Sequence, residues 1–205
     1  MGRVILVTGG AKSGKSMFAE RLVAGLGDHV VYVATGEAYD DEMQSRIALH
    51  RTRRPADWTT IEAPYDLRAA LEDVSPSAEV VLLDCLTLWT SNHLLALGDP
   101  DDPAWWNSVE VLQGRLLDML EGALAAAHAA RWHLVLVTNE VGSGIVPATP
   151  LGRAFRDLLG AVTQQASAVS DSVFLVVAGL GVEVKALALE PEDIARSLRG
   201  SSDYR

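Results

Sequence analysis

The sequence predicts an α/β fold in which a mostly parallel sheet is covered by helices on both faces. Three observations predict it. Short β-branched apolar runs recur along the chain, and each run is continuous, which is typical of strands buried on both faces. Segments with apolar residues at helical spacing separate the runs. Polar and glycine-rich residues follow the runs, at the carboxyl ends where such sheets bind ligands.

The elements follow from these patterns in order. Strands are expected at residues 4–8, 30–34, 80–84, 134–138 and 173–177, with an antiparallel edge strand at 182–189. Helices are expected at 17–23, within 40–54 before Pro55, and at 65–74, 106–131, 150–170 and 192–198. Residues 97–103, which contain Gly98, Pro100 and Pro103, are expected to form a loop.

Length and composition restrict the class of protein. A chain of 205 residues without repeats or a linker predicts one domain over residues 1–205. The net charge of −10 argues against a nucleic-acid binder. No apolar run is long enough for a membrane span, and the first strand begins too early to leave room for a signal peptide. A lone cysteine, Cys85, suits a reducing compartment, so we expect a cytoplasmic protein.

Residues 9–16 fit the phosphate-binding pattern G-x-x-x-x-G-K-[ST] and lie between an expected strand and an expected helix. They are Gly9, Gly10, Ala11, Lys12, Ser13, Gly14, Lys15 and Ser16. Such a loop lets main-chain N–H groups converge on one point, and the following helix adds its own N-terminal donors. Lys15 would reach the β- and γ-phosphates, and the Ser16 hydroxyl would bind Mg²⁺. The pattern therefore predicts binding of a nucleoside triphosphate.

Asp84 closes an expected strand, as the acidic residue that supports Mg²⁺ does in enzymes with this loop. A loop or helix-capping aspartate is the alternative. Cys85, which follows it, is expected to be a small buried apolar residue.

Four arginines and one histidine gather within residues 46–54 of this acidic chain. They are Arg46, His50, Arg51, Arg53 and Arg54. Guanidinium groups bind phosphate oxygens through two hydrogen bonds at once, so the cluster predicts a second phosphate site. Neighbouring positive charges would favour the neutral form of His50, which is the nucleophilic form. Taken alone, the pattern favours an exposed basic helix face with an ordinary histidine over a second phosphate site.

Glu62 and Glu140 are two further candidate carboxylates: Glu62 follows a short apolar segment, and Glu140 lies just after an expected strand. Glu62 could accept hydrogen bonds from a ribose or a guanine edge, and a surface carboxylate is the alternative. Glu140 lies in the glycine-containing stretch 139–144 and could orient a hydroxyl, with a simple loop as the alternative.

Five segments, taken in order, resemble a known family. They are V-T-G-G-A-K-S-G-K-S at 7–16, Y-V-A-T-G at 32–36, R-I-x-x-H-R-x-R-R-P at 46–55, L-L-D-C-L-T-L-W at 82–89 and V-T-N-E-V-G-x-G-I-V-P at 137–147. Together they look like the bifunctional adenosylcobinamide kinase / adenosylcobinamide-phosphate guanylyltransferase family of cobalamin biosynthesis.

The resemblance implies two reactions. The first phosphorylates adenosylcobinamide with ATP or GTP, and the second transfers GMP from GTP to the phosphorylated corrinoid through a guanylylated histidine. It implies a RecA-like P-loop fold, a homotrimer and Mg²⁺ as cofactor. Lys12 stands where the family usually has arginine, which keeps the charge but loses the bidentate geometry.

Mapped onto this chain, the resemblance implies His50 and Lys15 as catalytic residues and Ser16 and Asp84 as metal ligands. The implied nucleotide contacts outside residues 9–16 are Ala34, Thr35, Gly36, Arg51, Thr52, Arg53, Arg54, Glu62 and Asp84.

Two alternative functions remain open from the sequence. One is a P-loop kinase for another small metabolite, in which the arginine cluster acts as a lid. The other is a non-catalytic GTP-binding regulatory module.

Overall fold

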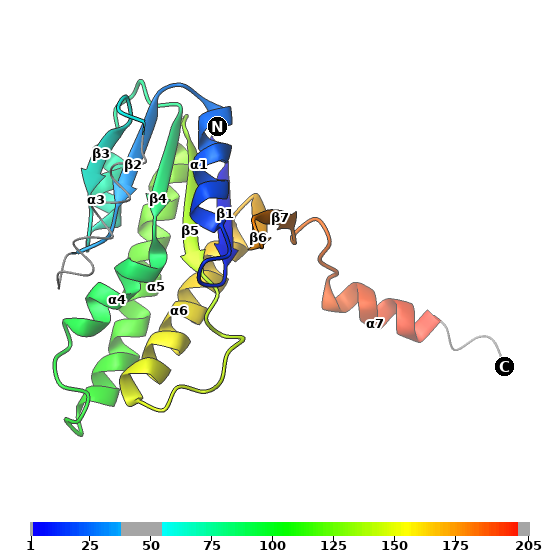
Figure 1. Cartoon of the computed structure of the whole chain (residues 1–205). Coiled ribbons are helices and arrows are strands. Elements are labelled where there is room, and N and C mark those ends of the chain that lie inside the picture. The colour runs from blue at the N-terminus through cyan, green and yellow to red at the C-terminus, as the bar shows by residue number, and fades with distance from the viewer. Residues whose placement is uncertain (1, 38–54, 201–205) are drawn as a thin grey trace.

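The computed structural model describes residues 2–37 and 55–200. Over these residues seven strands form one sheet in the order β3-β2-β4-β5-β1-β6-β7 (Figure 1). The strands are β1 (Val4–Gly9), β2 (Val30–Ala34), β3 (Thr59–Glu62), β4 (Val80–Asp84), β5 (His133–Asn139), β6 (Ser172–Val177) and β7 (Leu180–Glu183). All neighbours pair in parallel except β6 and β7, which are antiparallel. The predicted mostly parallel sheet with an antiparallel edge is confirmed.

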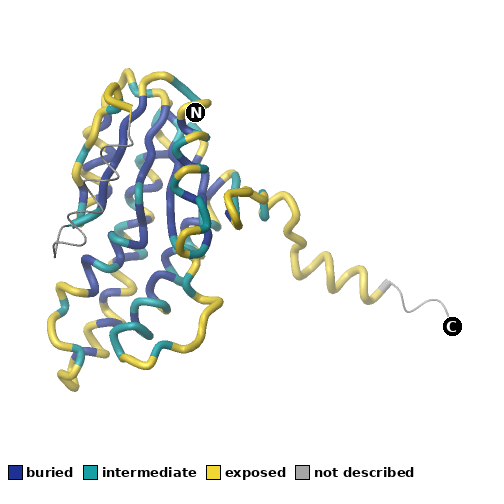
Figure 2. The backbone as a smooth tube through the Cα atoms, viewed as in Figure 1, coloured by how far each residue is buried: buried dark blue, intermediate teal, exposed yellow. Residues whose placement is uncertain are grey.

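Helices cover both faces of the sheet. They are α1 (Lys15–Leu26), α3 (Leu67–Glu72), α4 (Leu86–Leu95), α5 (Trp105–Ala129), α6 (Pro150–Val169) and α7 (Pro191–Gly200). One face packs on α1, and the other packs on α3, α4, α5 and α6 (Figure 1). Helix α7 projects away from the sheet, and its described side chains are exposed (Figure 2).

The packing of the central strands between two helical layers explains why their sequences are continuously apolar. Along β1, Val4 and Leu6 pack in the layer with α5 and α6, whereas Ile5 and Val7 pack in the layer with α1. The same alternation holds for the apolar residues of β2, β4 and β5, so successive apolar positions along these strands face the two hydrophobic layers in turn (Figure 2). Successive strand side chains point to opposite faces, so a strand covered on both sides needs apolar residues throughout.

The edge strand is shorter and earlier than the predicted 182–189. Ala178 and Gly179 both have positive φ, 50° and 81°, and they turn β6 directly into β7 as a two-residue hairpin. Glu183 ends the strand, where its carboxylate accepts hydrogen bonds from the main-chain N–H groups of Val173 and Ala186. The apolar residues beyond it, Leu187 and Leu189, are exposed. Periodicity alone could not reveal a turn whose first residue is alanine.

Two elements were not predicted. Strand β3 is a short edge strand with mainly exposed side chains, so it lacks an apolar run. Helix α4 is buried on almost all sides, including its polar Thr87, Thr90 and Asn92, and so has no separate apolar face. The helix expected within residues 40–54 lies outside the described residues. No helix within residues 2–37 and 55–200 combines the length and the apolar character needed to cross a membrane.

Candidate active site

The parallel strands bring the predicted site residues to one edge of the sheet. The loop of residues 9–16 follows β1, Thr35 follows β2, Glu62 ends β3 and Asp84 ends β4. Strand β5 lies between β1 and β4, so the loop and Asp84 stand two strand spacings apart, about 10 Å. Residues far apart in the sequence therefore share one edge of the sheet, where parallel sheets bind ligands.

The phosphate-binding loop has one of the left-handed glycines that its sequence suggests, at Gly14, whereas Gly9 and Gly10 have no positive φ and Lys12 does (58°). Gly14 adopts a left-handed conformation (φ 93°) directly before α1, and its carbonyl accepts the Phe18 N–H at 2.9 Å. Ser13 N donates to Gly10 O at 3.2 Å and closes the turn. A contact that the sequence did not indicate supports the loop from outside: Gly179 N, in the β6–β7 turn, donates to Ser13 O at 2.7 Å.

Substituting Gly14 by alanine should destabilise both the fold and the nucleotide site. An added Cβ would lie 3.0 Å from Gly179 Cα, at a φ of +93° that side chains rarely adopt. We expect the free energy of unfolding to fall by about 1–2 kcal/mol, together with weaker nucleotide binding. Gly25→Ala is the matched control, because it lies on the same helix and its Cβ would meet nothing within 4 Å. Denaturant unfolding and calorimetric titration with GTP would measure both effects, and unchanged values for G14A would contradict this reading.

Lys15 is buried within the loop. Its ammonium Nζ donates to Gly10 O at 3.3 Å, and its side chain is 9% exposed. Burial lowers the pKa of Lys15, and the proximity of Cys85 and Asp84 opposes this shift. Asp84 therefore stands close enough to the Lys15 ammonium to interact with it electrostatically, across the intervening strand.

The Asp84 carboxylate is oriented by Tyr32, a residue that the sequence did not single out. Tyr32 Oη donates to Asp84 Oδ2 at 2.7 Å from a buried ring. The Asp84 carboxylate and the Ser16 hydroxyl are oxygen donors of the kind that Mg²⁺ prefers. Over the described residues no group of three or more His, Cys, Asp or Glu side chains gathers at one point. This donor set fits an ion that keeps several waters and phosphate oxygens among its ligands.

Cys85 is the buried apolar residue that was expected. Burial raises the pKa of its thiol to about 12, so the group stays protonated at ordinary pH. A protonated buried thiol is a poor nucleophile, which leaves Cys85 a packing role.

Thr35 is buried, and its polar groups already have protein partners. Its N–H donates to Asp84 O at 3.2 Å, and its hydroxyl donates to Cys85 O and accepts from Cys85 N, both at 2.7 Å. These bonds join the end of β2 to the end of β4. Direct contact between Thr35 and a nucleotide stays a prediction, as it does for Ala34 and Gly36, its neighbours in the chain.

Of the remaining predicted residues, the structure describes Glu62 and Glu140 but not the arginine and histidine cluster. Glu62 ends β3 with an exposed side chain at the same sheet edge. Glu140 Oε1 accepts hydrogen bonds from Gly142 N at 2.6 Å and Ser143 N at 3.1 Å, so this carboxylate orders its own loop. Arg46, His50, Arg51, Thr52, Arg53 and Arg54 lie outside the described residues.

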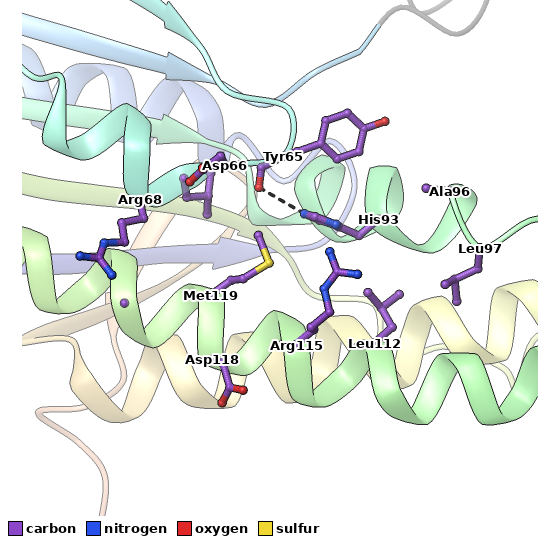
Figure 3. Close-up of a pocket in the computed structure, with 12 residues that line it drawn as sticks. Tyr65, Asp66, Arg68, His93, Ala96, Leu97, Leu112, Arg115, Asp118 and Met119 are labelled. Atoms are coloured by element: carbon purple, nitrogen blue, oxygen red, sulfur yellow. Dashed lines mark hydrogen bonds between the residues drawn. The ribbon is translucent and has the colours of Figure 1, made fainter.

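A cavity of about 670 Å³ lies between α3, α4 and α5 (Figure 3). His93 borders it and bonds through Nε2 to the Tyr65 carbonyl at 3.2 Å, which requires the ring nitrogen to donate. Burial lowers the pKa of His93, so its imidazole is neutral at ordinary pH. Arg115 and Asp118 also line the cavity, so its charges are mixed and select no single class of ligand. Strand β3, which precedes Tyr65, is separated from β1 and the phosphate-binding loop by β2, β4 and β5.

Comparison with known proteins places the chain among enzymes of corrinoid metabolism. Residues 5–184 match the family model described as cobinamide kinase / cobinamide phosphate guanyltransferase. The chain is 44% identical over 183 residues to the bifunctional adenosylcobalamin biosynthesis protein CobU of Salmonella typhimurium, covering 89% of this chain and 99% of that protein. CobU of Escherichia coli matches with the same identity and coverage. CobP of Pseudomonas aeruginosa is 41% identical over 180 residues, covering 88% of this chain and 96% of that protein.

Among solved structures, the RadB recombinase aligns over 85% of this chain and 74% of its own, with 15% identity and a TM-score of 0.46. Because this similarity is low, the description of the fold rests on the strand order alone. Helix α7 lies beyond the residues matched by the family model.

Proposed function

Because the chain belongs to the cobinamide kinase / cobinamide phosphate guanyltransferase family, we propose that one domain over residues 1–205 carries out both reactions. In the first, ATP or GTP phosphorylates the aminopropanol hydroxyl of adenosylcobinamide. In the second, GTP transfers GMP to adenosylcobinamide phosphate, which gives adenosylcobinamide-GDP and releases pyrophosphate. The observation that carries the proposal is that Lys15 and Asp84 meet at one sheet edge in a chain that matches this family over residues 5–184.

In the kinase reaction the loop of residues 9–16 holds the triphosphate. Main-chain N–H groups at the start of α1 face the phosphates, and the Lys15 ammonium offsets the negative charge of the β- and γ-phosphates. Phosphoryl transfer depends chiefly on such positioning and charge neutralisation. The corrinoid hydroxyl then attacks the γ-phosphorus and gives its proton to solvent, while the bond from that phosphorus to the bridging oxygen breaks and ADP or GDP leaves.

The transferase reaction needs a nucleophile besides the corrinoid phosphate, and we assign this role to His50. An imidazole nitrogen attacks the α-phosphorus of GTP, the bond to the bridging α–β oxygen breaks, and pyrophosphate leaves. The resulting phosphoramidate is then attacked by an oxygen of the corrinoid phosphate, which breaks the P–N bond and restores the imidazole. Arg51, Arg53 and Arg54 would neutralise the charge that develops on the phosphate oxygens.

Mg²⁺ would be held by Ser16 and Asp84, with the Asp84 carboxylate oriented by Tyr32. When bound, the ion would supply charge stabilisation to the phosphate oxygens. The acceptor is proposed to be a corrinoid and the donors ATP and GTP. A homotrimer is likewise proposed from the resemblance alone.

Labelling with radioactive GTP tests the covalent step. Incubation with α-³²P-labelled GTP should leave a label on the protein that is acid-labile and base-stable, as a phosphoramidate is, and the label should map to His50. GTP labelled at the γ-phosphate is the control and should transfer nothing to the protein in this step. A label on another residue, or no α-label at all, would refute the assignment.

A further inference from the structure

Buried side chains of α4 bind main-chain groups at the ends of the neighbouring strands. Thr87 Oγ1 accepts a hydrogen bond from Asn139 N, at the end of β5, at 2.7 Å. Trp89 Nε1 donates to the carbonyl of Tyr65, in the turn after β3, at 2.7 Å. His93 reaches the same carbonyl (Figure 3). Helix α4 itself begins directly after β4, so it links the carboxyl ends of several strands.

Asn92 makes the central link. Its amide nitrogen Nδ2 donates to Thr35 O and to Pro64 O, both at 2.9 Å, and the side chain is 1% exposed. One amide group therefore ties the end of β2 to the chain that leaves β3. Because the Thr35 hydroxyl also bonds both polar main-chain groups of Cys85, the end of β4 is joined to the same network.

These strand ends lead to residues that the transferase reaction needs. Gly36 follows Thr35, and the chain then continues toward His50. Glu62, which we expect near the guanine or ribose, lies two residues before Pro64. The phosphate-binding loop follows β1, which β4 and β5 separate from β2. Asp84 keeps an anchor of its own through Tyr32. Asn92 thus fixes the part of the edge remote from the phosphate-binding loop.

We propose that Asn92 is a positioning residue for guanylyl transfer, acting through the Thr35 and Pro64 carbonyls that it holds. The inference rests on the proposed function, since it assigns the two strand ends to the second reaction. Removing the amide would leave two carbonyl oxygens without these donors, and the strand ends would relax by a fraction of an ångström to find new partners. Group transfer is sensitive to such displacements, because the reacting atoms must be aligned.

The test compares Asn92→Leu with the intact protein in both reactions. Leucine has the same number of side-chain heavy atoms as asparagine and the same branch at Cγ, but it is bulkier and has no donor. With cobinamide phosphate as acceptor, we expect the kcat of guanylyl transfer and the rate of α-³²P labelling to fall about 10- to 100-fold, while phosphorylation of cobinamide keeps most of its rate. Thr90→Val is the matched control: Thr90 is buried on the same helix, and its hydroxyl has no hydrogen-bond partner over the described residues. This control should change neither rate.

Asn92→Ala provides a second variant, whose smaller side chain leaves room for a water to bridge the two carbonyls. We expect it to retain the kinase and to lose less transfer than Asn92→Leu. Equal loss of both activities in the two variants would show a role in the fold as a whole and overturn the proposal. Guanylyl transfer at the normal rate in Asn92→Leu would overturn the proposal as well. If the intact protein formed no guanylylated intermediate, that result would refute the proposed function, and with it the role of Asn92 that rests on it.

Discussion

Replacing His50 with alanine should abolish guanylyl transfer and leave the kinase intact. In the proposed mechanism the imidazole forms the covalent bond to the α-phosphorus in the transferase reaction only, whereas phosphorylation proceeds by direct attack of the corrinoid hydroxyl. Loss of a covalent nucleophile typically lowers kcat by roughly 10⁴-fold or more, so we expect transfer to fall below detection. Separate assays of cobinamide phosphorylation and of GMP transfer to cobinamide phosphate would measure the two rates.

His29→Ala is the control for this variant. His29 is exposed and precedes β2, at the edge of the sheet opposite the site, so its loss should change neither reaction. Transfer that survives in H50A would remove the covalent mechanism and favour a P-loop kinase with an arginine-rich lid. Loss of both reactions in H50A would also contradict the assignment, because it would place the histidine in the shared nucleotide site.

Replacing Lys15 with alanine should impair both reactions. In the proposed mechanism the two reactions share the phosphate-binding loop, where Lys15 supplies positive charge beside the Gly10 carbonyl and within electrostatic reach of Asp84. Loss of one such preorganised group costs about 10²- to 10³-fold in kcat, and we expect a decrease of this size in each reaction. Initial rates at saturating ATP and GTP would show it.

Arg21→Ala is the matched control for Lys15, since it removes a positive charge from an exposed position on the same helix and should leave both rates unchanged. The pattern across variants distinguishes the residues: His50 should affect one reaction and Lys15 both. A Lys15 variant that transferred GMP at the normal rate would mean that the two reactions use different phosphate sites.

The local parts of the fold were predictable because their causes are local. A strand covered on both faces must be apolar throughout, and the runs of β1, β2, β4, β5 and β6 show this directly in the sequence. The phosphate-binding loop was equally predictable, because Gly14 must take its positive φ immediately before the helix that Lys15 begins. In each case, the residues that determine the structure are neighbours in the chain.

The missed elements depend on partners that are distant in the chain. Helix α4 is stabilised on all sides by other elements, so Trp89 and Asn92 show no helical face in the sequence. Strand β3 owes its existence to pairing with β2, where Ala63 N donates to Ala34 O at 2.7 Å, rather than to an apolar run. Such elements are stabilised by contacts with neighbouring elements, and the periodicity of the sequence does not reveal those contacts.

By itself, the sequence determined that this chain has a sheet of parallel strands, a phosphate-binding loop and the segments that match its family, because each of these is encoded within a short stretch. Only the tertiary structure decided that Tyr32 orients Asp84 and that Asn92 joins the ends of β2 and β3. The physical reason is that a hydrogen bond depends on distance in space. Asn92 lies 57 residues from Thr35 in the chain, and folding alone brings its amide within 2.9 Å of that carbonyl.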